Sequence, residues 1–510
     1  MAKIIGNSGR YELTVDGKPF FILGAQIHNS SSWASMLPHA MKLASDLHAN
    51  TVEAPVYWET MEQRPGVFDF SNVDAVIDTA RAHHLRVVLL WFASFKTCCT
   101  YTPEYIKTDT KTYPRLRTAN DDPTAELSPY YESNLTADKR AFAALLRHIK
   151  ETDSSERTVI MVQVQNEPGA LNTARDHSPA ANKLFAGAVP APLVHALHKS
   201  AGTWTEVFGN DAEESFSAWG IARYIDAIAA AGKAEYPLPM YVNVWIGTPD
   251  SAMRPGLDYP SGGATFNVLD IWKVVAPNID LAAPDIYLQN SEFYRSVLKQ
   301  YHRPDNALFV PETIGFGGGG AEDPSRFLFD VMGEGAIGYS PFGLDSLPAN
   351  AFTAHPSESL ESLARSYELL GSMDQVLAAQ LFTGQMRTAV QESGHPNALL
   401  DFGKWRATIA FGQRRPPADP AAAARIAPGR VLITPLGADE FLVTGLNARV
   451  TFALSHPQPH ERWQYIRVEE GTYDGDIWKL SRWLNGDETF SGIVLRPEGN
   501  IVHVRLGSVE

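Results

Sequence analysis

The sequence predicts an α/β protein: a (β/α)8 TIM barrel followed by a smaller all-β sandwich domain. Between about residues 20 and 342, eight short apolar runs alternate with segments of helical periodicity, as in a barrel whose parallel strands are covered by helices. After about residue 380, apolar and polar residues alternate with a period of two and turn residues interrupt them, which is typical of antiparallel sheets. We therefore expect a barrel with an N-terminal hairpin over residues 1–380 and an all-β domain over residues 381–510.

Each part of the barrel has its own signal. The hairpin is predicted at residues 10–20, where Asp16-Gly17 is a turn signal between two strand-like runs. Helices are indicated where apolar residues recur at i, i+3, i+4 and i+7, as they do from Val73 to Ala80. The expected barrel strands are 20–26, 50–57, 86–92, 158–165, 239–245, 279–287, 307–313 and 335–342.

Composition and charge exclude several classes of protein. The chain has 510 residues and a formal net charge of -15 without a basic cluster, so the electrostatic signature of nucleic-acid binding is absent. No apolar run reaches the roughly 18 residues of a membrane span, and no secretory h-region is visible. The two cysteines, Cys98 and Cys99, are adjacent and fit neither a disulfide nor a zinc site. We expect a cytoplasmic protein, or a periplasmic or secreted one if a leader is missing. The chain could also form a homo-oligomer.

Two glutamates follow predicted barrel strands at the end where barrel chemistry takes place. Glu167 lies in Asn-Glu-Pro after the fourth strand, and Glu312 ends the seventh. A lone glutamate at a strand end usually caps a helix or forms a surface salt bridge. Glycoside hydrolysis, by contrast, needs two carboxyl groups at one site, here a barrel mouth. One protonates the leaving oxygen, and the other attacks the sugar or activates water.

The motifs around these strands resemble a known family. Together they are similar to the bacterial β-galactosidase-like branch of glycoside hydrolase family 35, which pairs a retaining (β/α)8 barrel with a C-terminal β domain. The resemblance implies a retaining, exo-acting β-D-galactosidase of carbohydrate metabolism, with a carbohydrate substrate and without a cofactor or metal. The segments that carry it are GAQIHNSSSW (24–33), TVEAPVYWETMEQRPGVFDF (51–70), RVVLLWFASFK (86–96), TVIMVQVQNEPG (158–169), ARDHSP (174–179) and GYSPFG (338–343).

The resemblance also implies roles for single residues. Glu167 matches the general acid/base and Glu312 the nucleophile, while Asn166 matches the residue that binds the sugar 2-hydroxyl. Tyr287 resembles the tyrosine that hydrogen-bonds the nucleophile. Pro168 is expected to keep the backbone of Glu167 extended.

Further substrate-binding candidates follow other barrel strands. An aromatic ring at a barrel rim can stack on a sugar face, and it can equally pack beneath a loop. These candidates are His28, Asn29, Tyr57, Trp58, Glu59, Trp91 and Asn243.

Some positions depart from the family pattern and leave alternatives open. Gln165 stands where relatives often have an acid, Pro168 where they have another residue, and FKTCC (95–99) where a Trp and an Asn are expected. The same chemistry on another sugar (a β-glucosidase, a β-arabinopyranosidase or a transglycosylase) is therefore an alternative. An inactive carbohydrate-binding protein is a more remote one.

Overall fold

The computed structural model describes residues 1–510 except 97–98, 248–252, 315–324, 353–357, 413–426 and 510. Cys98 lies outside the described residues. Two further segments also lie outside them: 315–320, whose glycines predict a loop beside Glu312, and 414–424, whose Pro-rich and Ala-rich composition predicts an exposed loop.

The expected barrel is confirmed. Eight strands form one sheet in the order β11-β10-β9-β6-β5-β4-β13-β12, and all of its paired strands are parallel. A parallel bridge between Ile286 and Thr313 joins the first and last strands and closes the sheet. The strands are β4 (Ile22–Gln26), β5 (Thr51–Tyr57), β6 (Arg86–Lys96), β9 (Val159–Asn166), β10 (Met240–Trp245), β11 (Leu281–Asp285), β12 (Val310–Thr313) and β13 (Gly338–Pro341).

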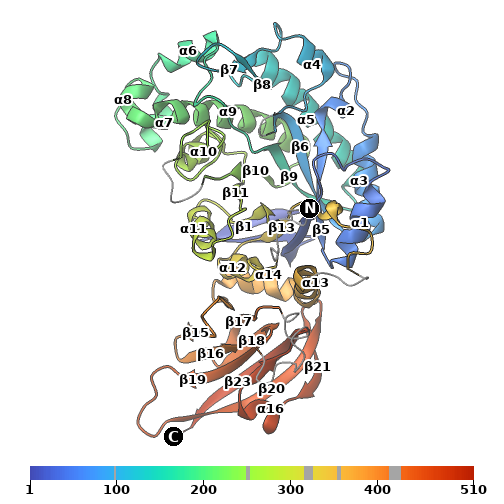
Figure 1. The fold of residues 1–510 in the computed structure, drawn as a ribbon, viewed down its shortest axis with the longest axis vertical. Coiled ribbons are helices and arrows are strands. Elements are labelled where there is room, and N and C mark those ends of the chain that lie inside the picture. Colours follow the sequence, from blue (N-terminus) through green and yellow to red (C-terminus); the bar gives the residue numbers. More distant parts are fainter. Residues whose placement is uncertain (97–98, 248–252, 315–324, 353–357, 413–426, 510) are drawn as a thin grey trace.

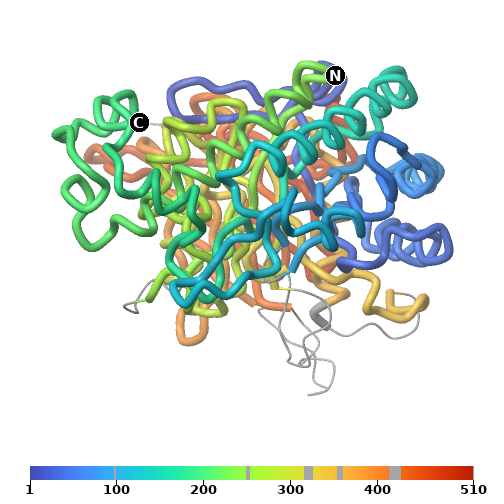
Figure 2. The backbone as a smooth tube through the Cα atoms, turned by 90° about the horizontal axis from the view of Figure 1, so that it is seen from above, coloured from blue at the N-terminus to red at the C-terminus, as the bar shows by residue number. Residues whose placement is uncertain are grey.

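Helices surround the barrel and bury its outer face (Figure 1). The segment from α6 to α8 lies at the outer edge of the molecule in two perpendicular views (Figures 1 and 2). A small hairpin of β7 (Arg115–Arg117) and β8 (Pro123–Leu127) lies in the long connection after β6. The helices are α1 (Leu37–Asp46), α2 (Trp58–Met61), α3 (Ser71–Ala82), α4 (Glu104–Thr108), α5 (Glu132–Asp153), α6 (Pro179–Phe185), α7 (Ala191–Ala196), α8 (Trp204–Phe208), η1 (Gly209–Asp211), α9 (Ala212–Glu235), α10 (Leu269–Val275), α11 (Ser291–Tyr301), α12 (Leu328–Gly333), η2 (Leu344–Ser346), α13 (Glu358–Gly371) and α14 (Asp374–Thr383).

The N-terminal hairpin packs against the barrel interior. β2 (Arg10–Val15) and β3 (Lys18–Phe20) turn at Asp16-Gly17 as expected, and β1 (Lys3–Asn7) adds a third strand that the sequence did not indicate. Leu13 and Val15 share one apolar cluster with the inward-facing side chains of the barrel strands. The hairpin therefore covers one end of the interior, and the opposite end is left for a site.

The all-β C-terminal part is also confirmed. Two antiparallel sheets face each other across an apolar core, one of six strands (β14-β17-β18-β23-β20-β21) and one of four (β15-β16-β19-β22). The elements are β14 (Arg387–Val390), β15 (Asn397–Phe402), β16 (Trp405–Phe411), β17 (Arg430–Gly437), β18 (Glu440–Leu446), β19 (Ala448–Leu454), β20 (Arg462–Asp474), β21 (Ile477–Trp483), α16 (Asp487–Phe490), β22 (Ile493–Leu495) and β23 (Asn500–Val509).

Two inner strands of the six-stranded sheet, β17 and β18, are buried on both faces. In β17, Val431 and Ile433 face the smaller sheet, while Leu432 faces the core that the barrel helices share. Successive side chains of a strand point to opposite faces, so one strand contributes to both cores. The two parts thus pack directly on each other, with α13 and α14 beside the contact (Figure 1). The division between residues 380 and 381 stays a prediction.

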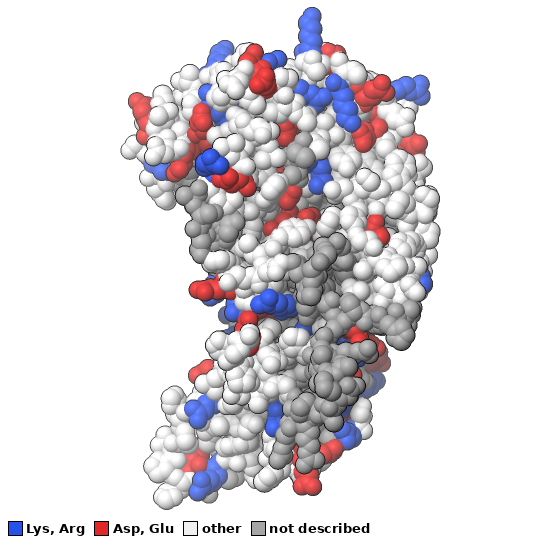
Figure 3. Space-filling view, viewed as in Figure 1, with Lys and Arg blue, Asp and Glu red and all other residues white. Residues whose placement is uncertain are grey.

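The surface carries charges of both signs. On the face in Figure 3, Lys and Arg are interspersed with Asp and Glu. Among the described residues, no helix combines the length and the apolar character needed to cross a membrane.

Candidate active site

Three strand ends bring three carboxyl groups together at the barrel mouth. Glu167 follows β9, Asp285 ends β11 and Glu312 lies in β12. One carboxylate oxygen from each lies within 4.8 Å of the others. Glu167 and Glu312 were expected to meet, whereas Asp285 was not among the predicted site residues. The sequence did contain a signal for Asp285: an acidic residue near the end of a predicted strand, which is the same signal that identified the two glutamates.

Glu312 is held by two hydrogen bonds. Tyr287 Oη donates to Oε1 at 2.6 Å, and Gln26 Nε2 donates to Oε2 at 3.0 Å. Burial and the charge of Glu167 raise the pKa of Glu312, while Tyr287, Lys96 and Gln26 favour its ionised form. Gln26 and Lys96, which end β4 and β6, were not among the predicted site residues.

The backbone at Glu167 is not extended, which corrects the expectation drawn from Pro168. Gln165 and Glu167 have φ values of 68° and 43°, both in the left-handed region. Such conformations cost on the order of 1–3 kcal/mol each and persist where the surroundings hold them. Here Asn243 Oδ1 accepts the Glu167 N–H at 2.8 Å. A side chain on Gly169 would lie 2.4 Å from Pro260, so the following turn needs glycine.

Two buried asparagines lie beside the carboxyl groups. Asn166 Oδ1 accepts hydrogen bonds from Gln163 Nε2 at 3.1 Å and Asn243 Nδ2 at 3.2 Å. Asn166 Nδ2 has no hydrogen-bond partner in the described part of the chain. A buried donor of this kind is suited to a hydroxyl group of a ligand. Asn243 instead holds protein groups, which makes it a support of the site.

Gln165 points away from the mouth. Its Oε1 accepts the Phe95 N–H at 2.9 Å, and its Nε2 donates to Asp138 at 2.8 Å. This departure from the family pattern therefore lies in the layer between sheet and helices, where it ties β9 to β6 and α5.

Two predicted sugar-contacting residues, Trp58 and Trp91, are also in that layer, and this placement is a correction. Both side chains are fully buried. Trp58 Nε1 donates to Glu62 at 2.8 Å, and Trp91 Nε1 donates to Asp138 at 2.9 Å. On β6, Leu90 and Phe92 line the barrel interior, so the intervening Trp91 must point outward.

Tyr57 does point into the barrel, but it is buried beneath other rings. It stacks between Trp33 and Tyr101, with ring centroids 6.0 and 5.6 Å away, and its Oη accepts the Ser32 N–H at 3.0 Å. Trp33 is 43% exposed. The ring offered to solvent in this stack is therefore Trp33, which was not among the predicted site residues.

Two other residues predicted to contact the sugar, Glu59 and His28, have protein partners of their own. Glu59 pairs with Lys107 of α4. His28 is anchored by Asp345, whose Oδ1 lies 2.9 Å from both its Nδ1 and its backbone nitrogen. Asn29 is half-buried in the same loop. Cys99 is exposed, and its N–H donates to the Lys96 carbonyl at 2.9 Å.

A further buried acid, Glu53 of β5, lies in the barrel interior. Tyr241 Oη donates to its Oε2 at 2.9 Å. Burial raises the pKa of Glu53 to about 8, and the charge of Glu312 adds to this shift. Glu53 is therefore a neutral acid near pH 7. Clustered carboxyl groups occur with and without a cation, so the arrangement of the site by itself assigns no metal.

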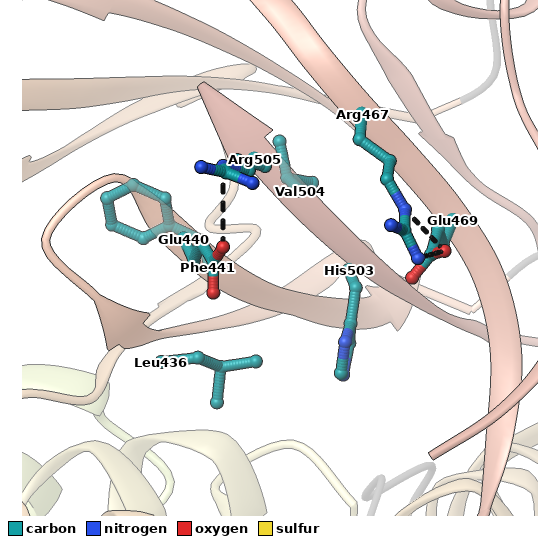
Figure 4. A pocket seen from close by; sticks show the side chains of 8 residues that line it. All are labelled: Leu436, Glu440, Phe441, Arg467, Glu469, His503, Val504 and Arg505. Atoms are coloured by element: carbon teal, nitrogen blue, oxygen red, sulfur yellow. Dashed lines mark hydrogen bonds and ion pairs between the residues drawn. The ribbon is translucent and has the colours of Figure 1, made fainter. Parts of the chain in front are cut away.

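A separate pocket lies on the six-stranded sheet of the C-terminal domain (Figure 4). It is a cavity of about 190 Å³ whose lining includes His503. Its charged side chains already have partners: Arg467 bonds to Glu469 at 2.6 Å, and Arg505 lies 3.5 Å from Glu440. Paired charges of this kind stabilise the sheet and leave fewer charged groups available to bind a ligand.

Two family models match parts of the chain. Residues 12–98 match glycosyl hydrolases family 35, and residues 363–496 match a domain of unknown function, DUF5597. A β-galactosidase from Xanthomonas manihotis is 36% identical over 77 residues, which is 14% of this chain and 13% of that protein. The chain is therefore matched to about an eighth of that relative's length.

Solved structures show a general likeness at 11–14% identity. A β-galactosidase from the psychrophilic Marinomonas ef1 has a TM-score of 0.49, covering 71% of this chain and 61% of the other. The catalytic domain of a Paenibacillus polymyxa β-amylase also has a TM-score of 0.49, covering 67% and 96%. An exo-β-1,4-mannosidase from Opitutaceae bacterium strain TAV5 has a TM-score of 0.46, covering 73% and 63%.

Proposed function

Because the chain belongs to glycosyl hydrolases family 35 through residues 12–98, we propose that it is a retaining, exo-acting β-D-galactosidase. The observation that carries the proposal is the short separation of Glu167 and Glu312, whose carboxylate oxygens lie within 4.8 Å. Retaining glycosidases place their two carboxyl groups about 5–5.5 Å apart, whereas inverting enzymes leave about 6.5–9.5 Å for a water molecule. The sugar is proposed from the family and from the β-galactosidase relative.

In the first half of the proposed reaction, Glu312 attacks the anomeric carbon. Glu167 gives its proton to the glycosidic oxygen, and the leaving group departs from a covalent glycosyl-enzyme. Tyr287 and Gln26 hold one oxygen of Glu312 each and so fix the direction of attack. In the second half, Glu167 takes a proton from a water molecule whose oxygen attacks the anomeric carbon. The bond to Glu312 breaks, and the sugar leaves with its original configuration.

Site-directed variants test the assignment of the two carboxyl groups. Glu312→Ala and Glu167→Gln are both expected to lose nearly all turnover of a nitrophenyl β-galactoside. Glu151→Gln, at an exposed position of α5, is the matched control and should keep the wild-type rate. Wild-type turnover by either site variant would contradict the proposal.

A panel of nitrophenyl glycosides tests the sugar, and NMR of the first-formed product tests the stereochemistry. We expect β-galactosides to be turned over fastest, with β-galactose as the initial product. Faster turnover of β-glucosides or β-arabinopyranosides would keep the mechanism and change the sugar. An α-configured first product would contradict the retaining mechanism.

A further inference from the structure

Asp285 has no place in the two-carboxylate mechanism, yet it lies beside both proposed catalytic groups. It ends β11, is 3% exposed, and its carboxylate lies within 4.8 Å of those of Glu167 and Glu312. A third buried acid next to two others is unfavourable if all three are ionised, because like charges in a poorly solvated site repel strongly. Its presence therefore calls for a role that offsets this cost.

Asp285 fixes the orientation of the Asn243 amide. Asn243 Nδ2 donates to Asp285 Oδ2 at 2.8 Å and to Asn166 Oδ1 at 3.2 Å. Since both of these partners are acceptors, the amide nitrogen must face them, and the amide oxygen is left facing the other way. That oxygen accepts the Glu167 N–H at 2.8 Å. The left-handed backbone of Glu167 is thus held by a chain of bonds that begins at Asp285.

The Asp285 carboxyl group also lies close to the Glu167 carboxyl group. One oxygen of each lies within 4.8 Å of the other, and Asp285 Oδ1 has no hydrogen-bond partner among the described residues. Two carboxylates cannot bond to each other without a proton, so a hydrogen bond between these neighbouring groups requires one proton that the pair shares.

We propose that Asp285 is a positioning residue for the acid/base Glu167, acting through the amide of Asn243 and through a proton shared between the two carboxyl groups. This inference rests on the proposed function. It adds a third carboxyl group to the reaction without giving it contact with the reacting atoms: Asp285 sets where the Glu167 carboxyl group points and how firmly it keeps its proton.

The surrounding charges agree with a protonated Asp285. Burial, followed by the charges of Glu312 and Glu167, holds the pKa of Asp285 well above its usual range. Among the described residues, three tyrosines also interact with its charge. They come from β10, from the segment after β11 and from α11, and are Tyr241, Tyr287 and Tyr301.

Two substitutions separate the two parts of the proposal. Asp285→Asn keeps an acceptor for Asn243 but removes the shared proton, whereas Asp285→Ala removes both. The matched control is Asp153→Asn. Asp153 is also buried and also supports β9, but at the opposite end of that strand, where it accepts the Thr158 and Val159 N–H groups at 3.0 and 2.8 Å.

The first readout is the pH profile of kcat/KM on a nitrophenyl β-galactoside. In the wild-type chain, loss of the shared proton leaves both Glu167 and Asp285 negatively charged. In Asp285→Asn, loss of the Glu167 proton leaves only Glu167 charged, so the cluster carries one negative charge fewer. The pKa governing the alkaline limb should therefore fall by about one unit or more in that variant. Asp153→Asn should leave the limb in place, because a loss of stability alone does not move it.

The second readout is the dependence on the leaving group. Alkyl β-galactosides need proton donation from Glu167, while dinitrophenyl β-galactosides hardly do. In Asp285→Ala, kcat/KM should therefore fall roughly tenfold more for the alkyl substrate than for the aryl one. An alkaline limb unchanged in Asp285→Asn, or equal losses on both substrates, would overturn the proposal.

The third readout does not depend on activity. A crystal structure of Asp285→Ala should show the Asn243 amide turned and its bond to the Glu167 N–H lost. If the wild-type protein turned over none of the glycosides, the proposed function would fail, and this structure would still decide the positioning role. An unmoved Asn243 and Glu167 would refute it.

Discussion

Glu53→Gln is expected to change how the stability of the protein depends on pH. The carboxyl group of Glu53 is buried in the barrel interior, where Tyr241 Oη donates a hydrogen bond to it at 2.9 Å. Its pKa is raised from 4.5 to about 8, chiefly by burial. An acid whose pKa is higher in the folded state than in the unfolded state adds to the free energy of unfolding. This stabilisation is fully present below pH 4.5 and is lost as the pH rises towards 8. Glutamine cannot ionise, so the variant lacks this dependence.

The magnitude follows from the size of the shift. Each pH unit between the two pKa values corresponds to roughly 1.4 kcal/mol. Over the interval from 4.5 to 8, the free energy of unfolding of the wild type should fall relative to that of Glu53→Gln by on the order of 5 kcal/mol. Because Glu53 is fully buried, solvent does not screen this effect as it would at the surface.

Denaturant unfolding at pH 5, 7 and 9 measures this difference. Other groups that titrate on unfolding, such as Asp285 and Glu312, are present in both proteins and largely cancel in the comparison. Glu151→Gln, on the exposed face of α5, is the control. Its free energy of unfolding should change with pH in the same way as that of the wild type. A wild-type-minus-variant difference that stays flat from pH 5 to pH 9 would refute the reasoning that Glu53 is held neutral.

Three further substitutions have separate expected outcomes. Tyr287→Phe removes the 2.6 Å bond to Glu312 and should lower kcat by about 100-fold at an unchanged unfolding free energy, measured by steady-state kinetics. Trp91→Phe leaves Asp138 without one of its buried donors and should destabilise the protein by about 1–3 kcal/mol in denaturant, with KM unchanged. Gly169→Ala would place a methyl group 2.9 Å from a backbone carbonyl oxygen and should lower both the melting temperature and kcat. Wild-type values in any of these assays would show that the contact in question is dispensable.

The architecture was predictable because its signals are local. Strands covered on both faces are apolar throughout, and the runs around β6 and β9 show this without knowledge of any neighbour. The barrel rule then places Glu167 and Glu312 at one mouth, because all strands of a parallel barrel end on the same side. The catalytic roles of these residues remain predictions, which the variants above test.

The side-chain environment was harder to predict because it depends on which face of a strand looks inward. Alternation along β6 says that Trp91 opposes Leu90 and Phe92, but the sequence does not say which set lines the interior. The sugar-contact prediction for Trp91 failed on this point. Trp33, by contrast, lies in the connection after β4 and is exposed to solvent while it stacks on Tyr57 at the end of β5.

The sequence by itself determined the class of the fold, the barrel strands and the two glutamates at their ends, since each follows from a local pattern. Only the tertiary structure decided how Glu167 is held: its left-handed backbone, the Asn243 amide beneath it and the carboxyl group of Asp285 against it. The bond between Glu167 and Asn243 alone joins residues 76 positions apart along the chain. Such contacts form when the barrel closes, and a pattern of neighbouring residues in the sequence does not predict them.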